Sequence, residues 1–169
     1  MRAFGKNSLT DAEVFALHAK TLSDAVPQLA LRTQYFSILI VCDSEQLPAE
    51  EICSFARALV DKGAMWVCTW GKGCERFHDR IDEVAVEMEL LGQLPPALGE
   101  SVLMTTWHER ESLAGALWFL LSCVWPQDKE WETWSTVVLT IGNQAWAHEA
   151  AECLKGMDEF RKQHVEGAD

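Results

Sequence analysis

The fold class is decided by one stretch, residues 35–70, which reads YFSILIVCDSEQLPAEEICSFARALVDKGAMWVCTW. Residues 35–42 form a nearly continuous apolar run, which is typical of a strand buried on both faces of a parallel sheet. Pro48 opens a segment with apolar residues at helical spacing, and Gly63 follows its end. A second apolar run covers residues 64–70. Strand, helix and strand in this order predict two parallel strands joined by a right-handed crossover.

The alternation of strands and helices continues toward the C-terminus. A helix is expected over residues 74–91, where the apolar residues form one stripe, and another over residues 111–125. Residues 101–107 and 135–142 supply a third and a fourth strand. Asn143 is suited to cap a last helix.

The two ends of the chain give weaker signals. Thr10 and Glu13 have the spacing of a capping box, so we expect an N-terminal helix over about residues 10–26. The tail after about residue 163 is expected to be frayed. A chain of 169 residues fits a single domain covering residues 1–169.

These elements predict an α/β fold, a three-layer doubly wound domain with a mostly parallel sheet of four or five strands and helices on both faces. With the strands numbered along the chain, the expected order is 2-1-3-4, because the most apolar strand should lie inside. Ligands of such sheets bind beyond the carboxyl ends of the strands, at the switch point. We expect the loops after the first and third strands to flank that crevice.

Composition restricts the class of partner. The formal net charge of −12 disfavours nucleic acid and anionic membranes, because both are bound mainly through Lys and Arg.

The N-terminus has no secretory pattern, and the longest apolar stretch, residues 113–125, is too short to span a bilayer. The spacing of the six cysteines matches no disulfide framework of secreted proteins. We expect a soluble cytoplasmic protein with reduced cysteines.

Polar residues at the predicted strand ends suggest one possible reaction site. Cys74 lies at a helix N-terminus, where the helix dipole lowers the pKa of a thiol, and His108 could act as its base. Asp43 or Glu109 would orient His108, with Ser44 nearby. The same residues suit helix capping, which every fold of this kind needs. We therefore keep a Cys/His-dependent enzyme or small-molecule site as the alternative hypothesis.

Signals for a metal or a nucleotide cofactor are incomplete. Cys74 and His78 lie four residues apart on one helix, but no paired CxxC, HxxxH or HExxH motif accompanies them. The turn from Gly71 to Gly73 is similar to a phosphate-binding turn, yet Arg76 stands where a dinucleotide motif needs glycine. We expect neither a metal nor a cofactor.

The predicted helix at residues 74–91 carries its acidic residues on one face, with Val86 exposed among them. Such a face is often only solvated, but it also suits docking to a basic protein. Tryptophan is a frequent interface anchor, although a loop rich in tryptophan can equally cover a small core. The expected binding residues are Glu75, Asp79, Asp82, Glu83, Val86, Trp107, Trp131 and Trp134.

Three stretches carry a resemblance to a known family: WGKGCERFHDRIDE (residues 70–83), MTTWHERESLAGALWFLL (residues 104–121) and IGNQAW (residues 141–146). They resemble an uncharacterised family of small acidic bacterial α/β proteins, known only as a domain of unknown function. The resemblance covers about residues 35–155. It implies a bacterial cytosolic α/β protein and no established catalytic residue or cofactor.

The absence of a complete catalytic motif favours a binding protein over an enzyme. We expect a non-enzymatic protein-binding module, immunity-like or regulatory, that holds a basic protein partner through an acidic surface bearing tryptophan. Exposed tryptophans would also suit a homodimer.

Overall fold

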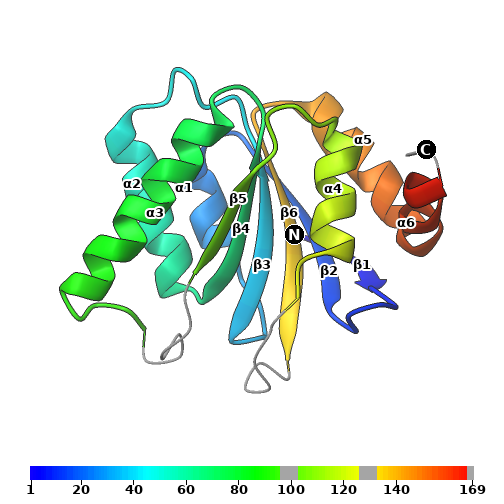
Figure 1. Cartoon of the computed structure of the whole chain (residues 1–169), viewed down its shortest axis with the longest axis horizontal. Helices are drawn as coiled ribbons and strands as arrows, with labels where there is room; N and C mark the ends of the chain where they lie inside the picture. The colour runs from blue at the N-terminus through cyan, green and yellow to red at the C-terminus, as the bar shows by residue number, and fades with distance from the viewer. Residues whose placement is uncertain (96–102, 126–132, 167–169) are drawn as a thin grey trace.

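The computed structural model describes residues 1–95, 103–125 and 133–166. Within these residues, six strands form one sheet in the order β1-β2-β6-β3-β4-β5 (Figure 1). All neighbouring strands pair parallel except β1, which is antiparallel to β2. The strands are β1 (Arg2–Lys6), β2 (Glu13–Ala19), β3 (Tyr35–Val41), β4 (Ala64–Trp70), β5 (Met104–Trp107) and β6 (Trp134–Ile141).

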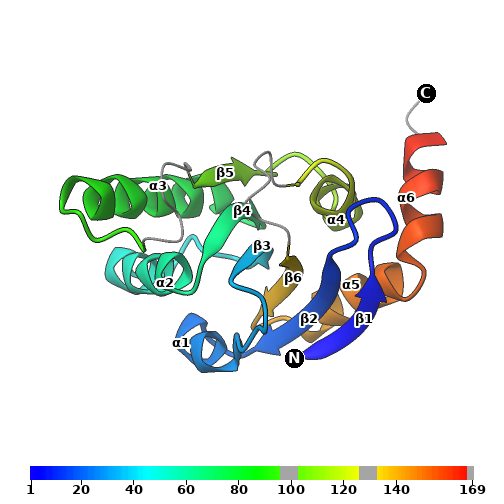
Figure 2. The same cartoon turned by 90° about the horizontal axis from the view of Figure 1, so that it is seen from below.

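Helices cover both faces of this sheet, as Figure 2 shows from below. Helices α1, α2 and α3 pack on one face, and α4 and α5 pack on the other. Helix α6 follows α5 and packs against α4. The predicted α/β class with a mostly parallel sheet is confirmed. The helices are α1 (Leu22–Ala25), the 3-10 helix η1 (Val26–Gln28), α2 (Ala49–Asp61), α3 (Cys74–Leu90), α4 (Leu113–Ser122), α5 (Gln144–Lys155) and α6 (Met157–Glu166).

The strand order differs from the prediction. Strand β6 is buried along its whole length and pairs with β3 on one side and β2 on the other. Strand β5 is short and exposes Met104 and Trp107, so it lies at the edge beside β4. The four predicted strands therefore run 4-1-2-3, and the order 2-1-3-4 is wrong. The count of four or five strands is also wrong, because the N-terminal segment adds β1 and β2 to the sheet.

This order moves the switch point of the sheet. The chain winds from β3 through β4 to β5 in one direction and then crosses back to place β6 on the other side of β3. The switch point therefore lies between β3 and β6. The loops after β3 and β5 are separated by the loop after β4, so the expectation that they face each other across the switch point is wrong.

The predicted N-terminal helix over residues 10–26 is also wrong. Asp11 has a φ of 58°, which belongs to the left-handed region and not to a helix. Thr10 and Asp11 lie in the turn between β1 and β2. The first helix of the chain is the short helix α1, which begins after Thr21. The Thr21 hydroxyl accepts a hydrogen bond from the Asp24 amide and caps this helix. At the other end, α6 continues through Glu166, past the predicted start of the frayed tail.

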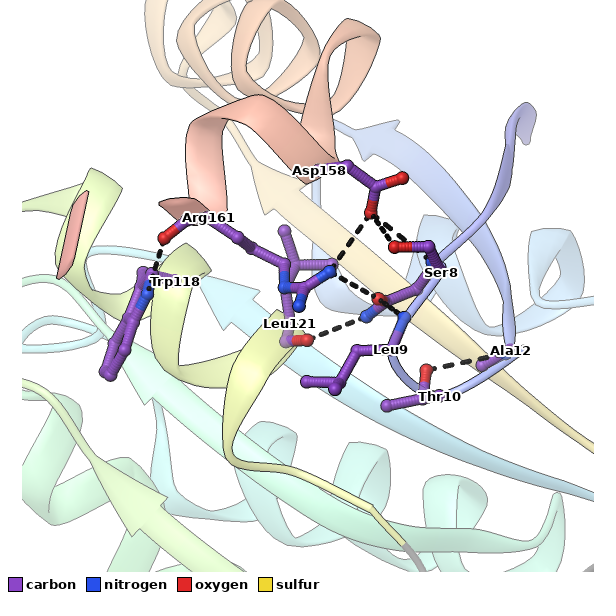
Figure 3. A network of polar contacts seen from close by, with 9 residues as sticks. Ser8, Leu9, Thr10, Ala12, Trp118, Leu121, Asp158 and Arg161 are labelled. Atoms are coloured by element: carbon purple, nitrogen blue, oxygen red, sulfur yellow. Dashed lines mark hydrogen bonds and ion pairs between the residues drawn. The ribbon is translucent and has the colours of Figure 1, made fainter. Parts of the chain in front are cut away.

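A buried asparagine fastens the turn between β1 and β2 to the C-terminal half of the chain. The Asn7 amide nitrogen donates to the Leu121 carbonyl at 2.7 Å, at the end of α4. Its side-chain oxygen accepts from the Leu9 amide and from the Arg161 guanidinium of α6. Beside it, the Ser8 hydroxyl donates to Asp158, also on α6 (Figure 3). The turn, α4 and α6 are thus joined by one hydrogen-bonded cluster.

We predict that Asn7→Ala lowers the free energy of unfolding by about 2 to 3 kcal/mol, because it leaves the partners of a buried amide without hydrogen bonds. Urea titration monitored by circular dichroism measures the change. Asn143→Ala is the control, since it removes only the N-cap of α5 and should cost about 1 kcal/mol. A loss for Asn7→Ala no larger than for the control would contradict this role.

The same cluster predicts a pH dependence. The hydrogen bond from the Ser8 hydroxyl, assisted by the charge of Arg161, lowers the pKa of Asp158 from its usual value of 3.8. A carboxyl with a lowered pKa stabilises the fold fully above its unfolded pKa, and this contribution is lost as pH falls through the folded-state value. The melting temperature of Asp158→Asn should therefore fall below that of the wild type at neutral pH and approach it under acid conditions. Ser8→Ala should weaken the same dependence, and a gap that stays constant with pH would refute it.

Candidate protein-binding surface

The turn before α3 is shaped by two glycines. Gly71 and Gly73 both have positive φ, and a Cβ on Gly71 would lie 2.4 Å from the Cys42 carbonyl oxygen. A Cβ on Gly73 would lie 2.9 Å from the Glu45 nitrogen. Glycine is therefore required here because the loop after β3 packs directly against this turn. Close packing of two loops explains the glycines without a phosphate.

Polar groups of the loop after β3 are used to hold the loop after β4. The Asp43 carboxylate accepts from the Lys72 amide at 3.0 Å, and the Ser44 hydroxyl donates to the Gly73 carbonyl at 2.8 Å. The Arg76 guanidinium of α3 donates to the carbonyls of Ser44 and Leu47. Asp43 and Ser44 therefore act as structural groups between the two loops.

Cys74 is at the start of α3, as predicted, but its chemistry differs from the prediction. The side chain is buried, and this burial raises the pKa of its thiol. Glu109 raises that pKa further, while the backbone of His108 partly lowers it. The expected lowering by the helix dipole is wrong, because desolvation of the thiolate is the larger effect.

His108 is held away from a role as base for Cys74. Its Nδ1 lies 2.8 Å from Glu111 Oε2, and its Nε2 lies 3.2 Å from the Thr106 hydroxyl. The ring packs on Phe119 of α4 at 4.7 Å between centroids, on the other face of the sheet from α3. In the described part of the chain no hydrogen bond joins the His108 ring to Cys74. The carboxylate that orients His108 is Glu111, which the sequence did not indicate. These contacts give the alternative of a Cys/His enzyme no support.

A second buried histidine joins α3 to the edge strand. His78 Nδ1 lies 3.1 Å from Asp79 Oδ1, and its Nε2 lies 2.9 Å from the Thr105 hydroxyl of β5. Thr105 in turn donates to Asp82 at 2.6 Å. The Trp107 ring lies against the His78 ring, with centroids 4.7 Å apart. Because both nitrogens of His78 are engaged, the ring that supports Trp107 is fixed in position.

We use the name α3–β5 surface for the exposed side chains along one face of α3 together with Trp107 at the end of β5. It combines acidic side chains with exposed apolar ones: Trp107 is 47% exposed and Leu90 is 82% exposed. Arg80 pairs with Glu83, while no ion pair to a Lys or Arg involves Asp79 among the described residues. Its exposed residues are Glu75, Asp79, Glu83, Val86, Glu89, Leu90 and Trp107.

The expected binding residues divide into three groups. Glu75, Asp79, Glu83, Val86 and Trp107 lie on the α3–β5 surface, with the half-buried Asp82 beside them holding Thr105. Trp134 is buried in the core at the start of β6, so its assignment to a binding surface is wrong. Trp131 lies outside the described residues. Trp134 directly precedes the strand predicted at residues 135–142, and the apolar run from Val137 to Leu139 in that strand could have indicated its burial.

Two further observations concern metal binding and membrane spanning in the described residues. No group of three or more His, Cys, Asp or Glu side chains is arranged to hold a metal ion there. Within those same ranges, every helix is too short or too polar to cross a membrane.

The family comparison covers most of the chain. The pattern of a family described as a domain of unknown function, DUF7684, matches residues 14–157, from β2 to the start of α6. The chain belongs to this family. The predicted membership of an uncharacterised family is confirmed, and the matched region begins well before residue 35, where the predicted resemblance starts. No curated protein and no solved structure matches the chain.

We predict that Cys42, Cys68 and Cys74 resist alkylation by iodoacetamide at neutral pH in the native protein. Burial raises the pKa of both Cys42 and Cys68 to about 12, and it raises the pKa of Cys74 as well. Mass spectrometry after a short reaction identifies the labelled cysteines, and the protein in guanidinium should label at all six. Rapid labelling of native Cys74 would restore the hypothesis of a reactive thiolate.

Proposed function

We propose that this chain is a cytoplasmic, non-enzymatic binding protein, immunity-like or regulatory, that holds a basic protein partner on the α3–β5 surface. The observation that carries the proposal is the position of Trp107. This tryptophan is half-exposed and rests on the fixed ring of His78, whose nitrogens contact the carboxylates of Asp79 and Asp82.

A tryptophan held in this way is suited to anchor a partner. Tryptophan contributes large contact area and is enriched among residues that dominate binding energy. Because His78 already fixes one side of the ring, less conformational entropy is lost when a partner covers the other side. The apolar side chains of Val86 and Leu90 extend the contact along α3.

The charge of the surface favours a basic partner over a second copy of the chain. Carboxylates near the anchor attract a basic protein at long range and raise its association rate. A symmetric homodimer through this surface would bring the same carboxylates face to face, which is unfavourable. The four-residue edge strand β5 also offers little backbone for strand addition, so side chains would make most of the contact.

We predict that Asp79→Lys with Glu83→Lys slows association with the partner at least about 10-fold at low salt, because steering is lost. The matched control is Glu149→Lys with Glu159→Lys, which changes net charge equally on exposed positions of α5 and α6. Affinity purification from the cells that encode the chain supplies the partner, and surface plasmon resonance measures the rates. If no stoichiometric basic protein is recovered, or if both double variants slow association equally, the proposal fails.

Truncation of Trp107 should change the dissociation rate of the complex more than its association rate. Trp107→Ala should weaken binding about 30-fold, as expected for a central aromatic anchor, mostly through a faster dissociation rate. Trp125→Ala is the control, because Trp125 is 45% exposed but follows α4 and lies outside the α3–β5 surface. Equal losses for the two variants would show that Trp107 has no special role.

A further inference from the structure

A cavity of about 270 Å³ lies at the opposite side of the molecule from β5. It is open to solvent on one side and bounded by α5 and by the strands β1, β2 and β6, which Figure 2 shows side by side. Its polar lining consists of Arg2, His18, Thr140, Gln144 and His148. The rest of the lining is apolar and includes Phe4 and the alanines of α5.

The charge of this cavity is opposite to that of the whole chain. The chain has 26 acidic and 14 basic residues, yet no Asp or Glu occurs among the described residues that line the cavity. Glu152, on the next turn of α5, interacts electrostatically with Arg2 and His148. Its carboxylate, however, accepts a hydrogen bond from Lys155. The first turns of α5 also form part of the wall, and the N-terminal end of a helix favours an anion.

The polar side chains of Arg2, Gln144 and His148 stand at the open side of the cavity, exposed to solvent, and form no hydrogen bond or ion pair with the described residues. The Arg2 guanidinium lies over the Phe4 ring at 4.7 Å and forms no ion pair with any described residue. His18 uses Nδ1 for a contact of 3.0 Å with the Thr140 hydroxyl, while its Nε2 contacts no other described polar group. The side chains of Gln144 and His148 likewise form no hydrogen bond in the part of the chain that the structure describes.

We propose that this cavity binds a small organic carboxylate with an apolar body. The planar guanidinium of Arg2 matches the two oxygens of a carboxylate, and Gln144 and His148 offer further donors at the same wall. Phe4 and the alanines of α5 would contact the apolar part of the ligand. One arginine with a largely apolar lining suits a monoanion better than a phosphate group. This inference is independent of the proposed partner surface.

The test uses benzoate as the probe and the whole chain as the protein. Isothermal titration calorimetry should give a dissociation constant below about 1 mM for benzoate, as a well-fitted ligand of this size allows. Benzyl alcohol, which has a similar size and no charge, should bind at least about 10-fold more weakly because it cannot pair with Arg2.

Variants assign the binding to this cavity. Arg2→Gln should weaken benzoate binding at least about 10-fold, whereas Arg32→Gln, an exposed arginine on the other face of the β1–β2 pair, should change it less than about 2-fold. Ala147→Leu should abolish binding by filling the cavity, with its fold checked by circular dichroism.

Three outcomes would overturn the inference. If no binding of benzoate is detected at a concentration of about 10 mM, a carboxylate site of useful affinity is excluded. Equal affinities of the wild type and Arg2→Gln exclude this cavity, and phosphate that binds more tightly than benzoate shows a site for inorganic anions instead. Affinity for the protein partner should be the same in Arg2→Gln and the wild type, so failure here is distinct from failure of the proposed function.

Discussion

The pairing of β3 with β6 along their whole length is the constraint on which the rest of the structure depends. Both strands are fully buried, so both must lie inside the sheet with helices on each face. Once β6 occupies one side of β3, β4 must take the other side, and β5 is left at the edge beside it. The same pairing leaves the outer side of β6 for β2. The two edges of the sheet, with their different charges, follow from this one contact.

The sequence predicts most of the strands and helices of this fold, but it does not predict the order of the strands in the sheet. The β3–α2–β4 unit and the stripe of α3 follow from local periodicity, which residues such as Phe77 and Ile81 satisfy without help from distant segments. Strand order depends on contacts between segments that lie far apart in the sequence. Strands β3 and β6 are equally buried, so both belong inside the sheet, and the greater apolarity of β3 could not decide the order. The N-terminal error has a similar cause. Thr10 and Glu13 have the right spacing for a helix cap, but pairing of β2 with β6 overrides that local preference.

In the candidate sites too, features set by local sequence could be predicted, whereas contacts between distant elements could not. The sequence indicates that Asp79 and Glu83 share one face of α3, because helix periodicity is a local property, and both side chains are exposed there. It could not show that His78 is buried under Trp107, or that Glu111 binds His108, since both contacts depend on how side chains pack between elements. The cavity of Arg2, His18 and His148 left no signal, because its lining comes from β1, β2, β6 and α5, which the strand order alone brings together.

The position of β2 in the sheet has a consequence for synthesis of the chain on the ribosome. His18 and Thr140, which touch across the β2–β6 pair, are separated by 122 residues in sequence. Contacts of such long range form late, because a long loop must close before they stabilise anything. The N-terminal hairpin is therefore made first and joins the sheet near the end. Until β6 leaves the ribosome, the inner edge of β2 is an open strand edge, exposed to other nascent chains and to chaperones.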